Sequence, residues 1–290
     1  IENNAEIPDI FFQKLHHHAN QTLRLGITGP PGAGKSTLTD QLIQQIISDG
    51  KSVGVVAVDP TSPFTGGALL GDRVRMNHYI WDDNVFIRSM GSHGDLGGLA
   101  RKAQDVGDVL AASGKDVVIF ETVGVGQGEL DVAKAVDLTI VVLVPESGDE
   151  VQLMKAGLVE IADIFVVNKS DRQGADRLAQ SLKSILHSIT KKDHLEPPIY
   201  NTSADRNEGI SELYKGLTDL TEVMVDKGLM NQKYLDRHRN RVLNLIQDRL
   251  LGKFWTQQRL DQLEDSVHNL SMTDESPYKV AKTLLDSANE

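Results

Sequence analysis

The sequence predicts a doubly wound α/β fold around a mainly parallel sheet, with helical extensions at both ends. Short apolar runs bounded by turn residues recur over the first two thirds of the chain. Most of them are continuous rather than alternating, which is typical of strands buried on both faces of a parallel sheet. Amphipathic helical stretches separate these runs, as expected when helices connect parallel strands.

In chain order, the expected strands are residues 23–28, 53–58, 85–87, 117–120, 138–144, 164–167 and 199–201. The expected helices around and between them are residues 10–15, 36–48, 99–111 and 178–189. Beyond residue 208 the chain is charged and helical, with an amphipathic helix over residues 234–250. That helix could pack on its own domain or act as a dimerisation arm. The predicted parts are a helical extension at 1–21, an α/β domain at 22–220 and a helical extension at 221–290.

Composition narrows the possible functions. The chain has 290 residues, of which 40 % are hydrophobic and 24 % charged, as in ordinary globular proteins. Its formal net charge of −11 argues against general nucleic-acid binding, and the absence of cysteine excludes thiolate metal sites. No apolar run approaches the roughly 18 residues of a membrane span. We therefore expect a cytoplasmic protein without a membrane anchor, although the start at Ile1 leaves room for a removed leader.

A phosphate-binding loop is predicted between the first expected strand and the helix that follows. The segment fits the pattern G-x-x-x-x-G-K-[ST], in a position where a chance glycine-rich turn is the weaker alternative. Its glycines let backbone amides face a phosphate, Lys35 supplies a cation and Ser36 can ligate magnesium. The expected nucleotide-binding residues here are Gly29, Pro30, Pro31, Gly32, Ala33, Gly34, Lys35, Ser36 and Thr37.

Two later segments predict a guanine-binding site. Asn168-Lys169-Ser170-Asp171 follows an expected strand and fits N-K-x-D. Asp171 can accept hydrogen bonds from guanine N1–H and the exocyclic amine, whereas adenine would leave a buried Asp171 unpaired. Thr202-Ser203-Ala204 is similar to a second guanine loop, with an ordinary turn as the alternative. The expected base-site residues are Asn168, Lys169, Asp171, Ser203, Ala204 and Asp205.

Carboxylates near the ends of expected strands predict a magnesium site. Glu121 opens Glu121-Thr122-Val123-Gly124, in the position of a D-x-x-G segment, although it could instead cap a helix. Asp59 ends the second strand at the edge where α/β sites form, and could bind magnesium or orient water. Asp72 is a further metal candidate or an exposed loop acid. The expected magnesium ligands are Ser36, Asp59, Asp72 and Glu121.

Three glycine-containing stretches, residues 62–71, 89–98 and 147–150, are expected to be loops. They could reorganise when a γ-phosphate binds, or simply connect secondary-structure elements. The consecutive residues His16, His17 and His18 do not share a helix face, so we interpret them as a solvated segment rather than a metal site.

The motifs in combination resemble the MeaB/ArgK family over roughly residues 20–210. The matching segments are residues 29–37, 58–62, 71–76, 96–99, 121–127 and 149–152, together with Lys155-Ala156-Gly157. The resemblance implies a P-loop GTPase of the metallochaperone-related class that forms a homodimer through helical extensions. It also implies a chaperone for an adenosylcobalamin-dependent mutase, usually methylmalonyl-CoA mutase, that gates cofactor loading and protects or reactivates the enzyme. Lys155 would lie in a third switch loop, or be an exposed helix lysine. At His93, where relatives often carry arginine, no role is transferred.

The expected reaction is hydrolysis of GTP to GDP and phosphate with Mg²⁺, with Lys35, Asp59, Glu121 and Lys155 as the catalytic candidates. Val125, not glutamine, follows Gly124, and no arginine finger can be assigned, so slow unassisted turnover is expected. Two alternatives remain. An ATP-dependent kinase linked to amino-acid transport is opposed by Asp171, and a metallochaperone GTPase would need cysteine or clustered histidine ligands.

Overall fold

The computed structural model describes residues 9–16, 22–59, 77–79, 81–91, 101–122, 128–145, 157–189, 195–268 and 276–287. The chain divides into two compact units, Ile1–Arg237 and His238–Glu290. The three-part organisation expected from the sequence stays a prediction.

The first unit is built on a seven-stranded sheet in which every strand pairing is parallel. The strand order is β3-β2-β4-β1-β5-β6-β7. The strands are β1 (Leu23–Thr28), β2 (Val53–Asp59), β3 (Val85–Gly91), β4 (Val117–Glu121), β5 (Leu138–Leu143), β6 (Ile164–Val167) and β7 (Ile199–Asn201). This arrangement confirms the predicted doubly wound α/β fold.

Helices connect the strands and continue to the end of the described chain. The α-helices of the first unit are α1 (Asp9–His16), α2 (Lys35–Ser48), α4 (Arg101–Ala112), α5 (Gly128–Ala135), α7 (Leu158–Ile161), α8 (Ala175–Ile189) and α9 (Ile210–Asp226). Two short 3₁₀ helices are η1 (Asn77–Tyr79) and η3 (Ala204–Arg206). The unit boundary falls within α10 (Leu229–Phe254), and the second unit also holds α11 (Gln257–His268) and α13 (Pro277–Asp286). Among the described residues, no helix combines the length and apolar character needed to span a membrane.

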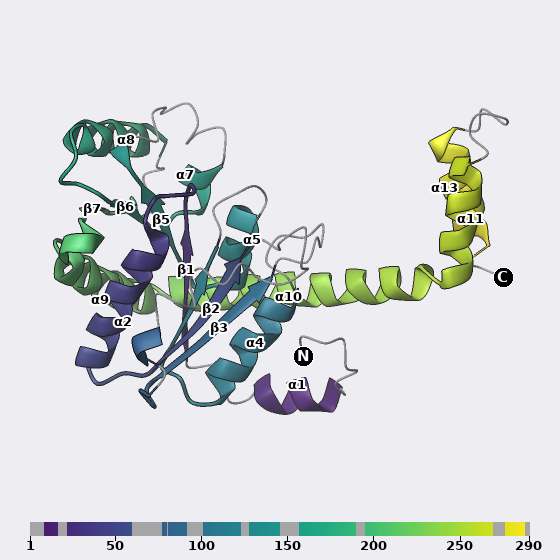
Figure 1. The fold of residues 1–290 in the computed structure, drawn as a ribbon, viewed down its shortest axis with the longest axis horizontal. Helices are drawn as coiled ribbons and strands as arrows, with labels where there is room; N and C mark the ends of the chain where they lie inside the picture. The colour runs from purple at the N-terminus through teal and green to yellow at the C-terminus, as the bar shows by residue number, and fades with distance from the viewer. Residues whose placement is uncertain are drawn as a thin grey trace. The chain divides into compact units, whose positions relative to one another are not determined.

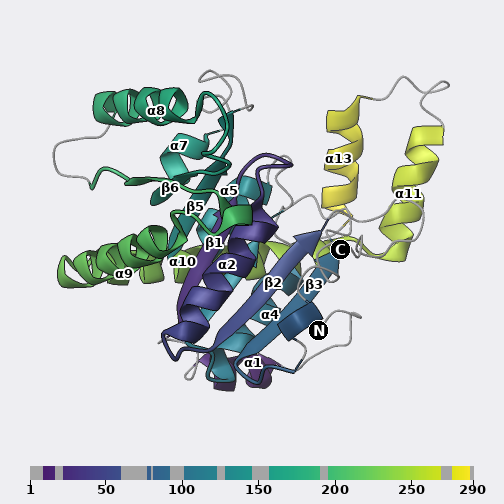
Figure 2. The same ribbon diagram turned by 60° about the vertical axis from the view of Figure 1, so that its left-hand side comes forward.

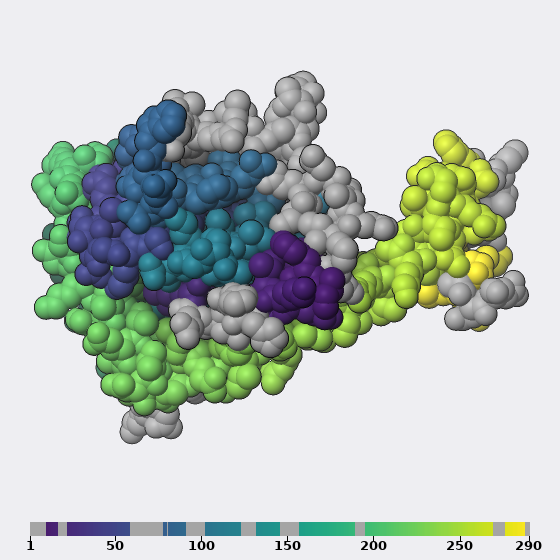
Figure 3. Space-filling view, turned by 90° about the horizontal axis from the view of Figure 1, so that it is seen from below, coloured from purple at the N-terminus to yellow at the C-terminus, as the bar shows by residue number. Residues whose placement is uncertain are grey.

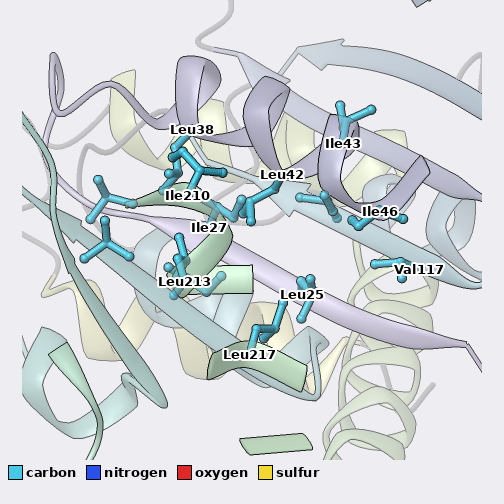
Figure 4. Close-up of a cluster of buried hydrophobic side chains, with 14 of the residues drawn as sticks. Leu25, Ile27, Leu38, Leu42, Ile43, Ile46, Val117, Ile210, Leu213 and Leu217 are labelled. Carbon is cyan, nitrogen blue, oxygen red and sulfur yellow. The ribbon is translucent and has the colours of Figure 1, made fainter. Parts of the chain in front are cut away.

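Two helical layers cover the sheet. Helices α2 and α9 pack on one face, and α4, α5, α7 and α8 pack on the other (Figures 1 and 2). On the first face, Leu38 and Leu42 of α2 meet Ile210 and Leu213 of α9 above β1 (Figure 4). Because β1 lies at the centre with helices on both sides, all of its residues after Leu23 are buried.

The amino-terminal edge of the sheet is held by ion pairs. Arg237 of α10 donates to Asp137, which precedes β5, at 2.6 Å, and Lys233 donates to Asp163, which precedes β6, at 2.7 Å. Arg24 of β1 pairs with Asp108 of α4 at 2.7 Å. The first part of α10 is therefore packed on its own domain. Helix α1 lies against α4 on the surface of this unit (Figure 3).

The largest error in a predicted strand boundary is at β3. Strand β3 continues to Gly91, so Ser89–Gly91 do not belong to the expected loop at 89–98. These residues are extended because β3 pairs with β2 along its whole length, ending with Asp59 opposite Gly91. The pairing partner, not the polar side chains of the segment, determines where this strand ends.

Candidate functional site

The predicted phosphate loop connects β1 to α2 with backbone geometry that requires glycine. Gly29 and Gly34 have φ angles of 139° and 84°, in the region that side chains disfavour. A Cβ atom at Gly29 would collide with the carbonyl oxygen of Val142, and one at Gly34 with the side-chain nitrogen of Asn168. The loop is thus packed tightly against β5 and against the segment that follows β6.

Lys35, the first residue of α2, places its ammonium group over this loop. The side chain is buried, and Nζ donates to the carbonyl oxygens of Gly29 at 2.9 Å and Pro30 at 3.1 Å. The amide of Ala33 donates to the Pro30 carbonyl at 3.2 Å and closes the turn. A cation and the amides of the first helical turn therefore meet at the amino terminus of α2, where an anionic phosphate is stabilised.

Hard oxygen atoms suited to magnesium lie beside this cation. Ser36 Oγ donates to Glu121 Oε1 at 2.6 Å, and Glu121 is only 3 % exposed at the end of β4. Next to this pair, the hydroxyl of Thr122 donates to that of Thr28 at 3.0 Å, which ties β4 to the residue preceding the phosphate loop. A hydroxyl and a carboxylate next to a phosphate site match the ligand chemistry of Mg²⁺.

The backbone of Asp59 ends β2 at this same edge of the sheet, two residues beyond Ala57, which pairs with Glu121. Its side chain lies outside the described residues. So do Asp72, Lys155, His93, and the predicted loops at 62–71, 92–98 and 147–150. Within the described ranges, no three His, Asp or Glu side chains are grouped closely enough to hold a metal by themselves.

Asn168 joins three segments of the site. This residue is 2 % exposed, and its Nδ2 donates to the carbonyl of Ala33 in the phosphate loop at 2.8 Å. Its Oδ1 accepts from Thr202 Oγ1 and from the Ala204 amide, each at 3.1 Å. The buried amide group thus uses both its donor and acceptor capacity to fix the relative positions of three loops.

Lys169 braces the phosphate loop from the other side. Its φ angle of 56° is left-handed, which is costly for a residue other than glycine. The conformation lets Nζ donate to the Gly32 carbonyl at 2.8 Å. Backbone strain at this position is therefore accompanied by a contact between the predicted base loop and the phosphate loop.

Asp171 presents its carboxylate between the two predicted base loops. Oδ1 accepts from Ser203 Oγ at 2.8 Å, and Oδ2 pairs with the guanidinium of Arg206 at 2.9 Å. The hydrogen bond from Ser203 is the main cause that lowers the pKa of Asp171 below its ordinary value, and the positive charge of Arg206 adds to it. The group is held ionised as an acceptor, which is the form that reads guanine N1–H and its amine.

The second base loop is held by its own backbone. Ala204 is buried at the start of η3, and the amide of Ser170 donates to the Thr202 carbonyl at 2.9 Å, joining this loop to the first. Asp205 Oδ1 also accepts from Ser203 Oγ, at 3.0 Å. Arg206 was not anticipated from the sequence, because no motif there marks an arginine two positions after Ala204.

The predicted residues that the structure describes lie along the carboxyl edge of the sheet. Glu121 ends β4, the phosphate loop follows β1, and the two base loops follow β6 and β7. The chain continues to one side of β1 after α2 and to the other side after β4, and such points are the usual ligand sites of open α/β sheets. The arrangement can bind a polyphosphate at one end and read a purine base at the other.

Comparisons with known proteins agree with this geometry. The family model described as methylmalonyl-CoA mutase-associated GTPase MeaB matches residues 3–259. A putative GTPase of Pyrococcus abyssi is 42 % identical over 288 residues, which cover 98 % of this chain and 89 % of the relative. The GTPase ArgK of Escherichia coli is 41 % identical over 219 residues, covering 74 % of this chain and 66 % of ArgK. The mitochondrial methylmalonic aciduria type A homolog of mouse is 36 % identical, covering 91 % and 65 %.

Solved structures show the same architecture. A crystal structure described as LAO/AO transport system kinase superposes with a TM-score of 0.70 at 27 % identity, covering 97 % of this chain and 86 % of the other. HypB from Helicobacter pylori, solved with nickel, shares the fold with a TM-score of 0.53 at 18 % identity, covering 73 % and 93 %. The chain belongs to the methylmalonyl-CoA mutase-associated GTPase family MeaB, and it is a P-loop GTPase that binds guanine nucleotide.

Proposed function

We propose that this GTPase is a nucleotide-switched chaperone of an adenosylcobalamin-dependent mutase, with methylmalonyl-CoA mutase as the first candidate. In this role it gates loading of the mutase cofactor and protects or reactivates the enzyme. The observation that carries the proposal is the match of residues 3–259 to a family described by its association with that mutase. The name of the mouse relative, a methylmalonic aciduria type A homolog, supports the same partner.

The phosphate end of the site suggests how the chain's own residues serve hydrolysis. Water attacks the γ-phosphorus of GTP, the bond to the β–γ bridging oxygen breaks, and GDP and phosphate leave. Lys35 and the loop amides stabilise the charge on the transferred phosphoryl group and on the leaving oxygen. Ser36 and Glu121, with Asp59 and Asp72 as further candidates, would hold Mg²⁺, which neutralises phosphate charge when bound. Lys155 is proposed to respond to the partner.

We expect slow unassisted turnover, on the order of 10⁻⁴ to 10⁻² s⁻¹, because GTPases of this class need a partner or an arginine to stabilise the transition state. Binding of the mutase is proposed to increase this rate. If the mutase accelerates hydrolysis, the bound nucleotide, GTP or GDP, depends on whether the mutase is bound. The proposed chaperone role requires this coupling.

A homodimer is the proposed assembly, formed through the C-terminal helices and acting in the cytoplasm without nucleic acid or membrane as a partner. The proposal of a dimer is supported by α10, which has no buried residue and carries a series of exposed apolar side chains. They are Val242, Leu243, Leu245, Ile246, Leu250 and Leu251. Exposed apolar surface of this kind commonly marks an interface.

A kinase is the second candidate, because the superposed structure with the TM-score of 0.70 is described as a transport system kinase. This alternative predicts ATP preference and a phosphorylated product. The carboxylate of Asp171 favours guanine instead.

The two candidates separate in one experiment. Phosphate release and formation of nucleoside diphosphate are both measured from GTP and from ATP, with and without purified methylmalonyl-CoA mutase, for the wild type and for Lys35→Ala as the inactive control. The proposal predicts turnover of GTP alone and an increase when the mutase is added. GTP turnover that does not change when the mutase is added would rule out the mutase as the partner. Conversion of ATP to ADP with transfer of phosphate to an acceptor would support the kinase.

A further inference from the structure

Arg206 makes an ion pair with the carboxylate that is proposed to read guanine. Its guanidinium lies 2.9 Å from Asp171 Oδ2, while Ser203 occupies the other carboxylate oxygen. The two loops that carry these residues are separate in sequence, so the ion pair connects the segment after β6 to the segment after β7. The side chain of Asp171 is 18 % exposed and that of Arg206 is 56 % exposed, which leaves the pair next to solvent.

The backbone around Arg206 is fixed. Its amide donates to the Ser203 carbonyl at 2.9 Å, and Ser203 and Glu208 exchange backbone hydrogen bonds of 3.0 and 3.1 Å. Asn207 closes the loop with a left-handed φ of 58°. At the start of the loop, the Ala204 amide is held by Asn168. Arg206 therefore extends from a closed, hydrogen-bonded loop whose position relative to Asp171 is set by the network around Asn168.

Two carboxylates lie next to the Ser203 hydroxyl, and the positive charge of Arg206 offsets the repulsion between them. Ser203 Oγ lies 2.8 Å from Asp171 Oδ1 and 3.0 Å from Asp205 Oδ1, but it has one proton to donate. When the proton is shared with Asp205, the hold of Ser203 on Asp171 weakens, and two carboxylates repel each other across one hydroxyl. The guanidinium on Oδ2 compensates this repulsion and keeps a second, independent hold on Asp171.

We propose that Arg206 is a positioning residue for base recognition, which holds the Asp171 carboxylate in the orientation that binds guanine. The inference rests on the proposed role of Asp171. Each carboxylate oxygen has two acceptor sites, so Ser203 and Arg206 fill one site on each oxygen. The acceptor capacity that remains on the two oxygens is available to guanine N1–H and to the exocyclic amine. Without Arg206 the Asp171 carboxylate can rotate. Binding of guanine then has to immobilise this side chain again, and the entropy lost weakens the affinity.

The effect should be limited to guanine nucleotides and sensitive to salt. Adenine has no N1–H donor, so ADP affinity does not depend on how Asp171 is oriented. Because Arg206 is more than half exposed, its contribution should shrink as ionic strength rises. A role limited to folding would instead change the affinity of both nucleotides.

The test is calorimetric measurement of GDP and ADP affinity for six forms of the full chain: wild type, Arg206→Ala, Arg206→Lys, Asp171→Ala, the Arg206→Ala/Asp171→Ala double variant and Arg177→Ala. Arg177, exposed on α8, controls for loss of one positive charge. We expect Arg206→Ala to weaken GDP binding about three- to tenfold at low salt, as for a partly exposed charged hydrogen bond, with ADP unchanged. The GDP affinity of Arg206→Lys should lie between those of wild type and Arg206→Ala, and that of Arg177→Ala should stay within about twofold of wild type.

The double variant shows whether Arg206 acts through Asp171. In the Asp171→Ala background, removal of Arg206 should have no further effect on GDP affinity. The inference is overturned if Arg206→Ala leaves GDP binding unchanged, tightens it, or weakens ADP equally, or if the Arg206→Ala effect persists without Asp171. If Asp171→Ala itself leaves the GDP-to-ADP ratio intact, the base assignment fails and the role of Arg206 fails with it. If the GDP-to-ADP affinity ratio falls in Asp171→Ala but not in Arg206→Ala, the base assignment holds and only the proposed role of Arg206 is rejected.

Discussion

The lysines beside the phosphate loop and the basic side chains at the opposite edge of the sheet make different kinds of contact. At the carboxyl edge, Lys35 and Lys169, together with the uncharged Asn168, donate to backbone carbonyls and so hold loops in place. At the amino edge, Arg237 and Lys233 instead donate to carboxylates and hold α10 against the domain. One edge arranges groups around a space for a ligand, whereas the other satisfies its charges internally.

This difference indicates which edge of the sheet contributes to nucleotide binding and which contributes to stability. A hydrogen bond to a neutral backbone carbonyl does not cancel the charge of a lysine, whereas an ion pair with a buried carboxylate does. Substitution of Lys35 or Asp171 at the carboxyl edge should therefore change nucleotide turnover or binding more than it changes stability. Substitutions at the amino edge should do the reverse.

The largest expected effect is on base selectivity. Asp171→Ala should reduce the preference for GTP over ATP by up to about 10⁴, because a site built to hydrogen-bond a base rejects one that lacks the donor. Phosphate affinity should be retained, since Lys35 and the loop are unchanged. Competition binding with GDP and ADP measures the preference. An unchanged ratio would show that the base is read elsewhere.

The sharpest test of the amino edge is Arg237→Ala. This side chain is 12 % exposed and pairs with Asp137 at 2.6 Å, so its removal leaves a buried carboxylate without its cation. We expect a loss of about 3–5 kcal/mol in the free energy of unfolding, measured by urea denaturation. Lys227→Ala, at an exposed position after α9, is the control and should change stability by less than about 0.5 kcal/mol. GTP turnover below the unfolding transition should stay within about twofold of wild type, and a larger loss would mean that this edge also serves the site.

A third effect separates chemistry from folding at the carboxyl edge. Lys35→Ala should lower GTP turnover about 10²- to 10³-fold, the usual result of removing one group that stabilises transition-state charge. Phosphate release under saturating GTP measures it. Lys233→Ala, which removes a lysine from the amino edge, is the matched control and should retain turnover. Equal losses in both variants would contradict the division between the edges.

Much of this fold could be predicted from the sequence, and particular elements show why. Strands β1, β6 and β7 have the predicted ends, because the apolar run of each strand stops at a polar or glycine residue where the chain turns. Strand β3 was predicted too short, since Arg88 and Ser89 are polar and only the pairing with β2 keeps them extended. Local pattern predicts burial, but pairing partners decide where an edge strand ends.

The site shows the same limit. Its motifs located Lys35, Asn168 and Asp171, because each spacing reflects a local backbone geometry. Its long-range contacts could not be predicted. The hydrogen bond from Asn168 to Ala33 spans 135 positions and that from Lys169 to Gly32 spans 137. Such pairs depend on how the completed sheet brings loops together, which no local pattern encodes.

Thermal unfolding with and without GDP tests the division between the edges most directly. It is measured on wild type, Asp171→Ala and Arg237→Ala. A ligand that binds only the folded state raises Tm by an amount that grows with the logarithm of the ratio of ligand concentration to Kd. The account predicts that Arg237→Ala melts at a lower temperature but keeps the rise caused by GDP, while Asp171→Ala melts close to wild type and loses most of that rise. A GDP response lost in Arg237→Ala, or kept in full by Asp171→Ala, would contradict it.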